Sequence, residues 1–147
     1  MKTLFEEASR NTVLSRVEKI NAETRPRWGK MNSAQMLSHL TESLRMACAE
    51  ITPKPKRLPI RYFPFKQLLI YWLPFPKGAP TAPELLRSDY GTVERNKAEI
   101  TRLLNAFAER AGATQWPEHP AFGRLTRTGW GVLTLRHFDH HLRQFGV

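Results

Sequence analysis

Two histidines near the C-terminus, His137 and His141, are spaced so that both can bind one metal ion. Residues four apart on an α-helix are separated by about 40° around the axis and by about one turn of rise. His140 lies about 100° around from His141, which places it off this line. A pair of histidines at this spacing also occurs on partly exposed helices without a metal, so the pair alone leaves both interpretations open.

A metal site needs a third ligand, and the sequence offers two candidates. His39 lies in an apolar helical stretch, whereas His119 lies in a loop, flanked by prolines. A histidine from a facing helix suits a site inside a helical bundle, which favours His39. We expect His119 and His140 to stay outside the ligand set. Three neutral imidazoles would leave a divalent ion electrophilic and with open positions, which suits catalysis.

Other groups with catalytic chemistry are few. Glu42 follows His39 by about one helical turn and is our candidate general base toward a metal-bound water. Cys48 lies about 180° away from His39 on the same predicted helix, so we expect it to pack as a small apolar residue. Asp139 points away from the metal line and is expected to be solvated. The sequence contains no glycine-rich phosphate loop, no Gly-x-Ser-x-Gly and no His-Glu-x-x-His.

The apolar residues that must position these groups follow helical spacing over most of the chain. This spacing predicts helices over residues 11–20, 32–50, 88–111 and 127–144. Asn32 and Gln35 have the spacing of a capping box at the start of the second helix. Residues 62–73 are aromatic and apolar and are predicted as a short helix or as irregular structure. The sequence therefore predicts an all-α four-helix bundle.

Length and composition indicate one domain over residues 1–147. Within it we expect a loosely structured leader over residues 1–9 and an irregular basic and aromatic insert over residues 51–87. No run of about 18 apolar residues is present, and the first residues are charged, so we expect a cytoplasmic protein with no membrane partner. A single cysteine excludes a disulfide framework.

The net charge of +10 is concentrated in the insert, since no acidic residue lies between Glu50 and Glu84. Such a surface can attract nucleic acid, anionic lipid or an anionic small molecule, or it can simply be a solvated loop. No nucleic-acid-binding motif is present, which argues against nucleic acid. We expect five cations to surround the approach to the metal and to attract an anionic cosubstrate: Lys54, Arg57, Arg61, Lys66 and Lys77.

In these residues the chain resembles the DinB-like metal-binding superfamily, which includes the YfiT-type metal-dependent hydrolases. The family pattern is a histidine on the second helix, soon after a Trp and a Gln, and then His-x-x-His-His on the last helix. The matching residues here are Trp28, Gln35 and His39, and then the run from His137 to His141. Residues 28–31, 74–83, 119–126 and 139–146 resemble a branch of that superfamily classed as a domain of unknown function.

The resemblance implies an up-down-down-up four-helix bundle, often dimeric, with His39, His137 and His141 as ligands to a divalent metal, zinc or nickel. Related proteins include thiol-dependent transferases and isomerases, in which the metal lowers the pKa of a small thiol that then attacks an electrophile. The resemblance thus implies a metal-dependent enzyme acting on a small-molecule substrate by thiol transfer. The alternatives are a metal-dependent hydrolase and a non-catalytic metal- or ligand-binding module. The insert is larger than in simpler relatives and is expected to form a lid or a substrate wall.

Overall fold

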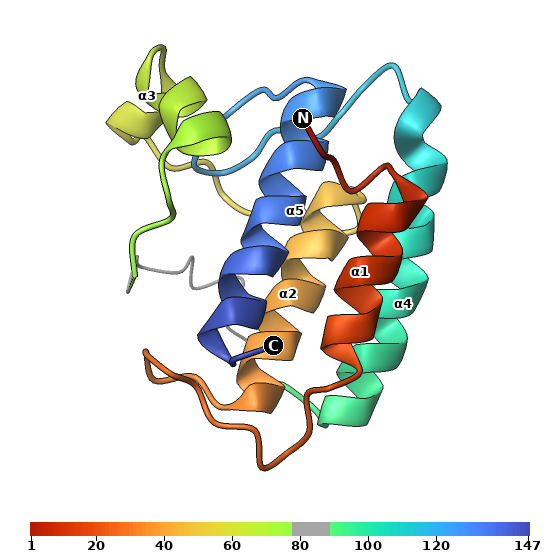
Figure 1. The fold of residues 1–147 in the computed structure, drawn as a ribbon. Coiled ribbons are helices and arrows are strands. Elements are labelled where there is room, and N and C mark those ends of the chain that lie inside the picture. Colours follow the sequence, from red (N-terminus) through yellow and green to blue (C-terminus); the bar gives the residue numbers. More distant parts are fainter. Residues whose placement is uncertain (78–88) are drawn as a thin grey trace.

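The computed structural model describes residues 1–77 and 89–147. Its long helices form one bundle (Figure 1), and they are α1 (Glu7–Val17), α2 (Ser33–Ala47), α4 (Val93–Glu109) and α5 (Arg127–Gln144). In Figure 1, α1 and α5 run down the page and α2 and α4 run up it, which is the up-down-down-up order. The described residues contain no strand, only an isolated bridge between His119 and Gly123. The predicted all-α bundle is confirmed.

Local capping interactions set the start of the helix that carries His39. The Asn32 side chain accepts a hydrogen bond from the Gln35 backbone N–H at 2.8 Å, and the Gln35 side chain accepts one from the Asn32 N–H at 2.9 Å. This confirms the predicted capping box. The helix ends at Ala47, earlier than predicted, because Ala49 adopts a left-handed backbone conformation with φ of 63°.

The N-terminal residues differ from the predicted loose leader. Leu4 is fully buried, and its backbone N–H donates to the Gly131 carbonyl of α5 at 3.1 Å. Phe5 stacks on Phe107 of α4 with ring centroids 4.6 Å apart. Helix α1 therefore begins at Glu7, within the predicted leader, and ends at Val17. The apolar side chains before α1 seal one end of the core.

Because α2 and α4 run in the same direction, a long crossover must connect them. Its described part contains three short helical turns: η1 (Pro59–Arg61), α3 (Phe65–Gln67) and η2 (Leu68–Trp72). Ile70 is buried against Val132 and Leu133 of α5, which anchors these turns. Residues 78–87 of the predicted insert, and Ser88 at the start of the predicted third helix, lie outside the described residues. Residues 89–92 are not helical, so α4 begins later than predicted, where the Thr92 side chain caps it by accepting from the Arg95 backbone N–H. Another short turn, η4 (Arg110–Gly112), follows α4.

The core lies where the long helices meet, and its largest fully buried side chains include Leu40, Leu103, Phe107, Trp130 and Phe138. Helix α2 packs against both α4 and α5, so a side chain on one face of α2 meets the inward face of α5. Among the described helices, none is both long and apolar enough to cross a membrane.

Candidate metal centre

The structure brings together three histidines from two neighbouring helices. His39 comes from the middle of α2, and His137 and His141 lie one turn apart on α5. The Nε2 atom of His137 lies 2.9 Å from that of His39 and 3.1 Å from that of His141. One ligand atom from each of the three lies within 4.8 Å of the others. Three nitrogens bound at about 2.0–2.1 Å to one tetrahedral ion would lie about 3.3 Å apart, so this spacing suits a single ion.

Gln144 determines which nitrogen of His141 faces the centre. The Gln144 amide nitrogen donates to the Trp28 backbone carbonyl at 2.7 Å, which leaves its Oε1 toward His141 Nδ1 at 2.8 Å. An amide oxygen only accepts hydrogen bonds, so Nδ1 of His141 carries the proton. The Nε2 atom of His141 then presents a lone pair to the other two rings. Such a fixed tautomer is the usual arrangement of a metal-binding histidine.

The tautomer of His141 limits the hydrogen bonds that the three converging nitrogens can form with one another. With a lone pair on His141 Nε2, the contact to His137 needs a proton on His137 Nε2. His39 Nε2 also lies 2.9 Å from His137 Nε2, so this one proton lies between two neighbouring nitrogens. A divalent cation would accept a lone pair from each nitrogen and remove this competition. The donor set therefore fits a bound metal ion.

The surroundings of the centre favour neutral imidazoles, which are the form that binds metal. Burial, followed by the neighbouring histidines His141 and His39, holds the pKa of His137 well below its usual value of 6.5. Burial is also the main reason that the pKa of His141 is lowered to about 3. A proton is thus disfavoured where a cation with fixed ligands would be stabilised.

His140 lies beside the three histidines but does not converge with them. Its ring centroid is 6.0 Å from that of Trp28 and 5.9 Å from that of Phe75. The same residues line a cavity of about 420 Å³, together with Lys77 and Arg143 among others. Its pKa is lowered, chiefly by partial burial. His140 therefore lines this cavity and lies outside the converging group.

Sequence reasoning missed two arginines at this cavity. Arg136, His140 and Arg143 are spaced by four and three residues, so they share one face of α5 next to the ligand face. This helical spacing was a signal available in the sequence. Arg136 also donates hydrogen bonds to the carbonyls of Leu69, at 2.9 Å, and Ile70, at 2.5 Å, so it ties the crossover to α5.

The five cations expected around the approach are spread over the crossover. Lys77 lies at the cavity, with Nζ 4.6 Å from the centroid of the Trp28 ring. Arg61 forms an ion pair with Glu118 at 2.9 Å, and Lys66 donates to the carbonyl of a residue in the same loop before α5. Lys54 and Arg57 are exposed and do not line this cavity. Attraction of an anionic cosubstrate by these groups stays a prediction, and Lys77 is its best-placed member.

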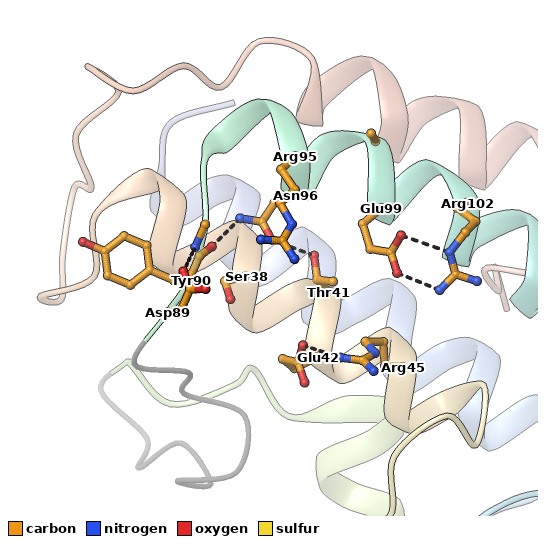
Figure 2. A pocket seen from close by; sticks show the side chains of 12 residues that line it. Ser38, Thr41, Glu42, Arg45, Asp89, Tyr90, Arg95, Asn96, Glu99 and Arg102 are labelled. Atoms are coloured by element: carbon orange, nitrogen blue, oxygen red, sulfur yellow. Dashed lines mark hydrogen bonds and ion pairs between the residues drawn. The ribbon is translucent and has the colours of Figure 1, made fainter.

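Glu42 is buried on α2 and lines a second cavity of about 650 Å³ between α2 and α4. Figure 2 shows its carboxylate beside Arg45, whose Nη1 donates to Glu42 Oε1 at 3.1 Å. Among the residues that the structure describes, the converging group consists of the three histidines, so Glu42 is not one of its members. Its role as a general base stays a prediction.

His119 has a structural position in the loop before α5. Its Nδ1 accepts hydrogen bonds from the backbone N–H groups of Ala121, at 3.1 Å, and Phe122, at 3.2 Å. Its ring lies 5.5 Å, centroid to centroid, from that of Trp130. Burial, and secondly the charge of Arg61, lower its pKa to about 3. Like His140, it is not part of the converging group.

The site can be compared with known proteins through the whole bundle that carries it. The sequence model of the DinB superfamily matches residues 7–145, a span that includes every long helix and the three converging histidines. Neither a curated protein nor a solved structure matches the chain significantly. On the strength of the family match, the chain belongs to the DinB superfamily.

Proposed function

We propose that this protein is a metal-dependent enzyme that uses its three-histidine centre for thiol-dependent transfer or isomerisation. The observation that carries the proposal is the convergence of His39, His137 and His141, whose ring nitrogens lie at a spacing that suits one metal ion. A bound divalent ion, zinc or nickel, would supply a Lewis acid that lowers the pKa of a small thiol.

The cavity beside His140 supports binding of an anionic cosubstrate. Asp139 also lines it and pairs with Arg143 at 2.9 Å, but Lys77 and Arg136 keep the charge of the lining positive. Trp28 and Phe75 supply apolar surface. In the proposed reaction the thiolate sulfur forms a bond to an electrophilic carbon of the second substrate. The leaving group departs with the electron pair of the bond that breaks. Binding and orientation of the thiol are the roles that we propose for these cavity residues.

Metal analysis of protein purified without a histidine tag tests the first half of the proposal. We expect about one divalent ion per chain, lost in His39→Ala and in His137→Ala. His119→Ala and His140→Ala are the matched controls and should keep the metal. Loss of metal from His140→Ala, or its retention by His137→Ala, would show that the ligand set is misassigned.

Cobalt substitution tests the chemistry separately. A thiol that binds Co²⁺ through sulfur gives a sulfur-to-metal charge-transfer absorption, so adding a small acidic thiol to the cobalt protein should produce this band. If the absorption spectrum of the cobalt protein does not change when a thiol is added, this result contradicts thiol transfer and favours the hydrolytic alternative. In that case Glu42→Gln should abolish ester or amide hydrolysis, because hydrolysis requires a base to take a proton from water.

A further inference from the structure

The exposed apolar side chains of this protein gather on one segment of the crossover. Among the described residues, and apart from Met1, every large apolar side chain that is exposed lies between residues 58 and 73. Phe63 is 79% exposed and Trp72 is 74% exposed. Scattered exposed apolar residues are normal, but a cluster of this kind marks an interaction surface. We call it the aromatic surface, and its members are Leu58, Tyr62, Phe63, Phe65, Leu68, Trp72 and Leu73.

The aromatic surface is built by the fold. Figure 1 shows that the helical turns around α3 project from the side of the bundle, near the N-terminal end of α5. Ile70 is buried against α5, and Arg136 donates to the carbonyls of Leu69, Ile70 and Leu73. Lys66 donates to the Arg124 carbonyl at 3.1 Å. These contacts hold the segment in place while its largest aromatic side chains face solvent.

Positive charge accompanies the aromatic surface along the chain. Residues 51–77 contain no acidic residue, and their cations include Lys54, Arg57 and Lys66. Arg124 lies next to Lys66 through the hydrogen bond to its carbonyl, and its side chain is 93% exposed. Glu118 pairs with Arg61 and with Arg124, so it offsets one of these charges and leaves the surface basic. The occupant of this surface should therefore be apolar in part and anionic.

We propose that the aromatic surface binds the face of an anionic lipid bilayer. Tyr and Trp side chains favour the headgroup level of a bilayer, and Phe and Leu side chains favour the acyl boundary below it. Lys and Arg near them attract anionic headgroups, which complement the positive charge of this segment. Our expectation of no membrane partner rested on the absence of a spanning segment, and binding at the surface requires none.

Charge also distinguishes the bilayer from a second copy of this chain. A symmetric dimer built on the aromatic surface would place the same cations of both copies at one interface. Arg57 and Lys66 would then face like charges, whereas an anionic bilayer neutralises them. The observations thus favour lipid over self-association at this surface.

Co-sedimentation of the full-length protein with vesicles tests the proposal. We expect binding to vesicles that contain phosphatidylglycerol and not to vesicles of phosphatidylcholine alone, with binding that weakens as salt is raised. Phe63→Ser should weaken the binding by about tenfold, which corresponds to about 1.4 kcal/mol. Arg57→Glu should weaken it by about tenfold as well, since it replaces an attraction with a repulsion.

Lys19→Glu is the matched control, because Lys19 is an exposed cation just after the end of α1. In Figure 1 the C-terminal end of α1 and the turns around α3 lie toward opposite ends of the bundle. It should leave vesicle binding almost unchanged. Helical circular dichroism of each variant shows whether the fold is kept. Failure to bind anionic vesicles, or equal binding to both vesicle types, overturns the proposal. A dimer that Phe63→Ser converts to monomers, without vesicle binding, also overturns it and assigns the surface to a second copy.

Discussion

Protonation of His119 should destabilise this fold in mild acid, and the variant that tests this is His119→Asn. The His119 Nδ1 accepts two backbone hydrogen bonds, from Ala121 and Phe122, and a proton on that nitrogen would break both. The Oδ1 atom of asparagine occupies nearly the same position as Nδ1, so it can accept the same bonds without titrating.

The magnitude follows from the two pKa values of His119. Its pKa is about 3 in the folded protein against 6.5 for an unperturbed histidine. Between these values the unfolded chain binds more protons than the folded one, so stability is full above about pH 6.5 and falls as the pH drops toward about 3. Between about pH 7.5 and about pH 5 this group alone removes about 2 kcal/mol from the free energy of unfolding.

Urea unfolding at both pH values, with a chelator present, gives the two free energies for each protein. His137 and His141 also have lowered pKa values, so both proteins lose stability through these groups between the two pH values. We therefore compare how much the free energy of unfolding falls in the wild type with how much it falls in His119→Asn. We expect the variant to lose about 2 kcal/mol less than the wild type over this interval.

His140→Asn is the control, since His140 is only partly buried and should contribute less to the acid loss. An equal loss of stability in wild type and His119→Asn would refute the reasoning. It would mean that the imidazole of His119 accepts its proton in the folded state, with the loop before α5 adjusting around it.

Three further variants test the structure around the site. Gln144→Leu removes the hydrogen bond that orients His141, the proposed ligand. Zinc affinity, measured in competition with a chromophoric chelator, should therefore fall about 10–100-fold, and unchanged affinity would contradict this role. Gly131→Ala would place a Cβ 2.8 Å from the ring of Phe5, so it should lower the free energy of unfolding by about 1–3 kcal/mol in the same urea assay. Its control is Gly112→Ala, whose Cβ meets nothing within 4 Å and should change the free energy by less than about 0.5 kcal/mol. Arg136→Met frees three carbonyls of the crossover, so hydrogen exchange over residues 68–73 should accelerate while exchange in α4 stays constant; equal rates in both proteins would show that this arginine is not an anchor.

Much of the bundle followed from local patterns in the sequence. The capping box of Asn32 and Gln35 and the helix that carries His137 and His141 depend on interactions within a few residues of each other. The spacing of these two histidines makes them neighbours on any α-helix. The third histidine, His39, was predictable from its apolar helix and from the family pattern.

The tertiary structure decided the features that depend on contacts between distant residues. The sequence predicts a loose leader at Leu4, whereas in the fold its backbone N–H donates to the Gly131 carbonyl on the last helix. The proton position on His141 depends on Gln144, whose own orientation is set by the carbonyl of Trp28. These contacts join residues far apart in the sequence, so they produce no regular spacing that a sequence pattern could reveal.

The cations of the crossover show the same division. Composition alone established a long stretch without acidic residues, but only packing separated Lys77, at the cavity, from Arg61 and Lys66, at the loop before α5. An irregular segment lacks the periodicity by which a helix or strand places its side chains on one face or another. The positions of its side chains therefore depend on where the segment is anchored. Here the anchor is Arg136 on α5, and its hydrogen bonds to the crossover carbonyls exist only in the folded chain.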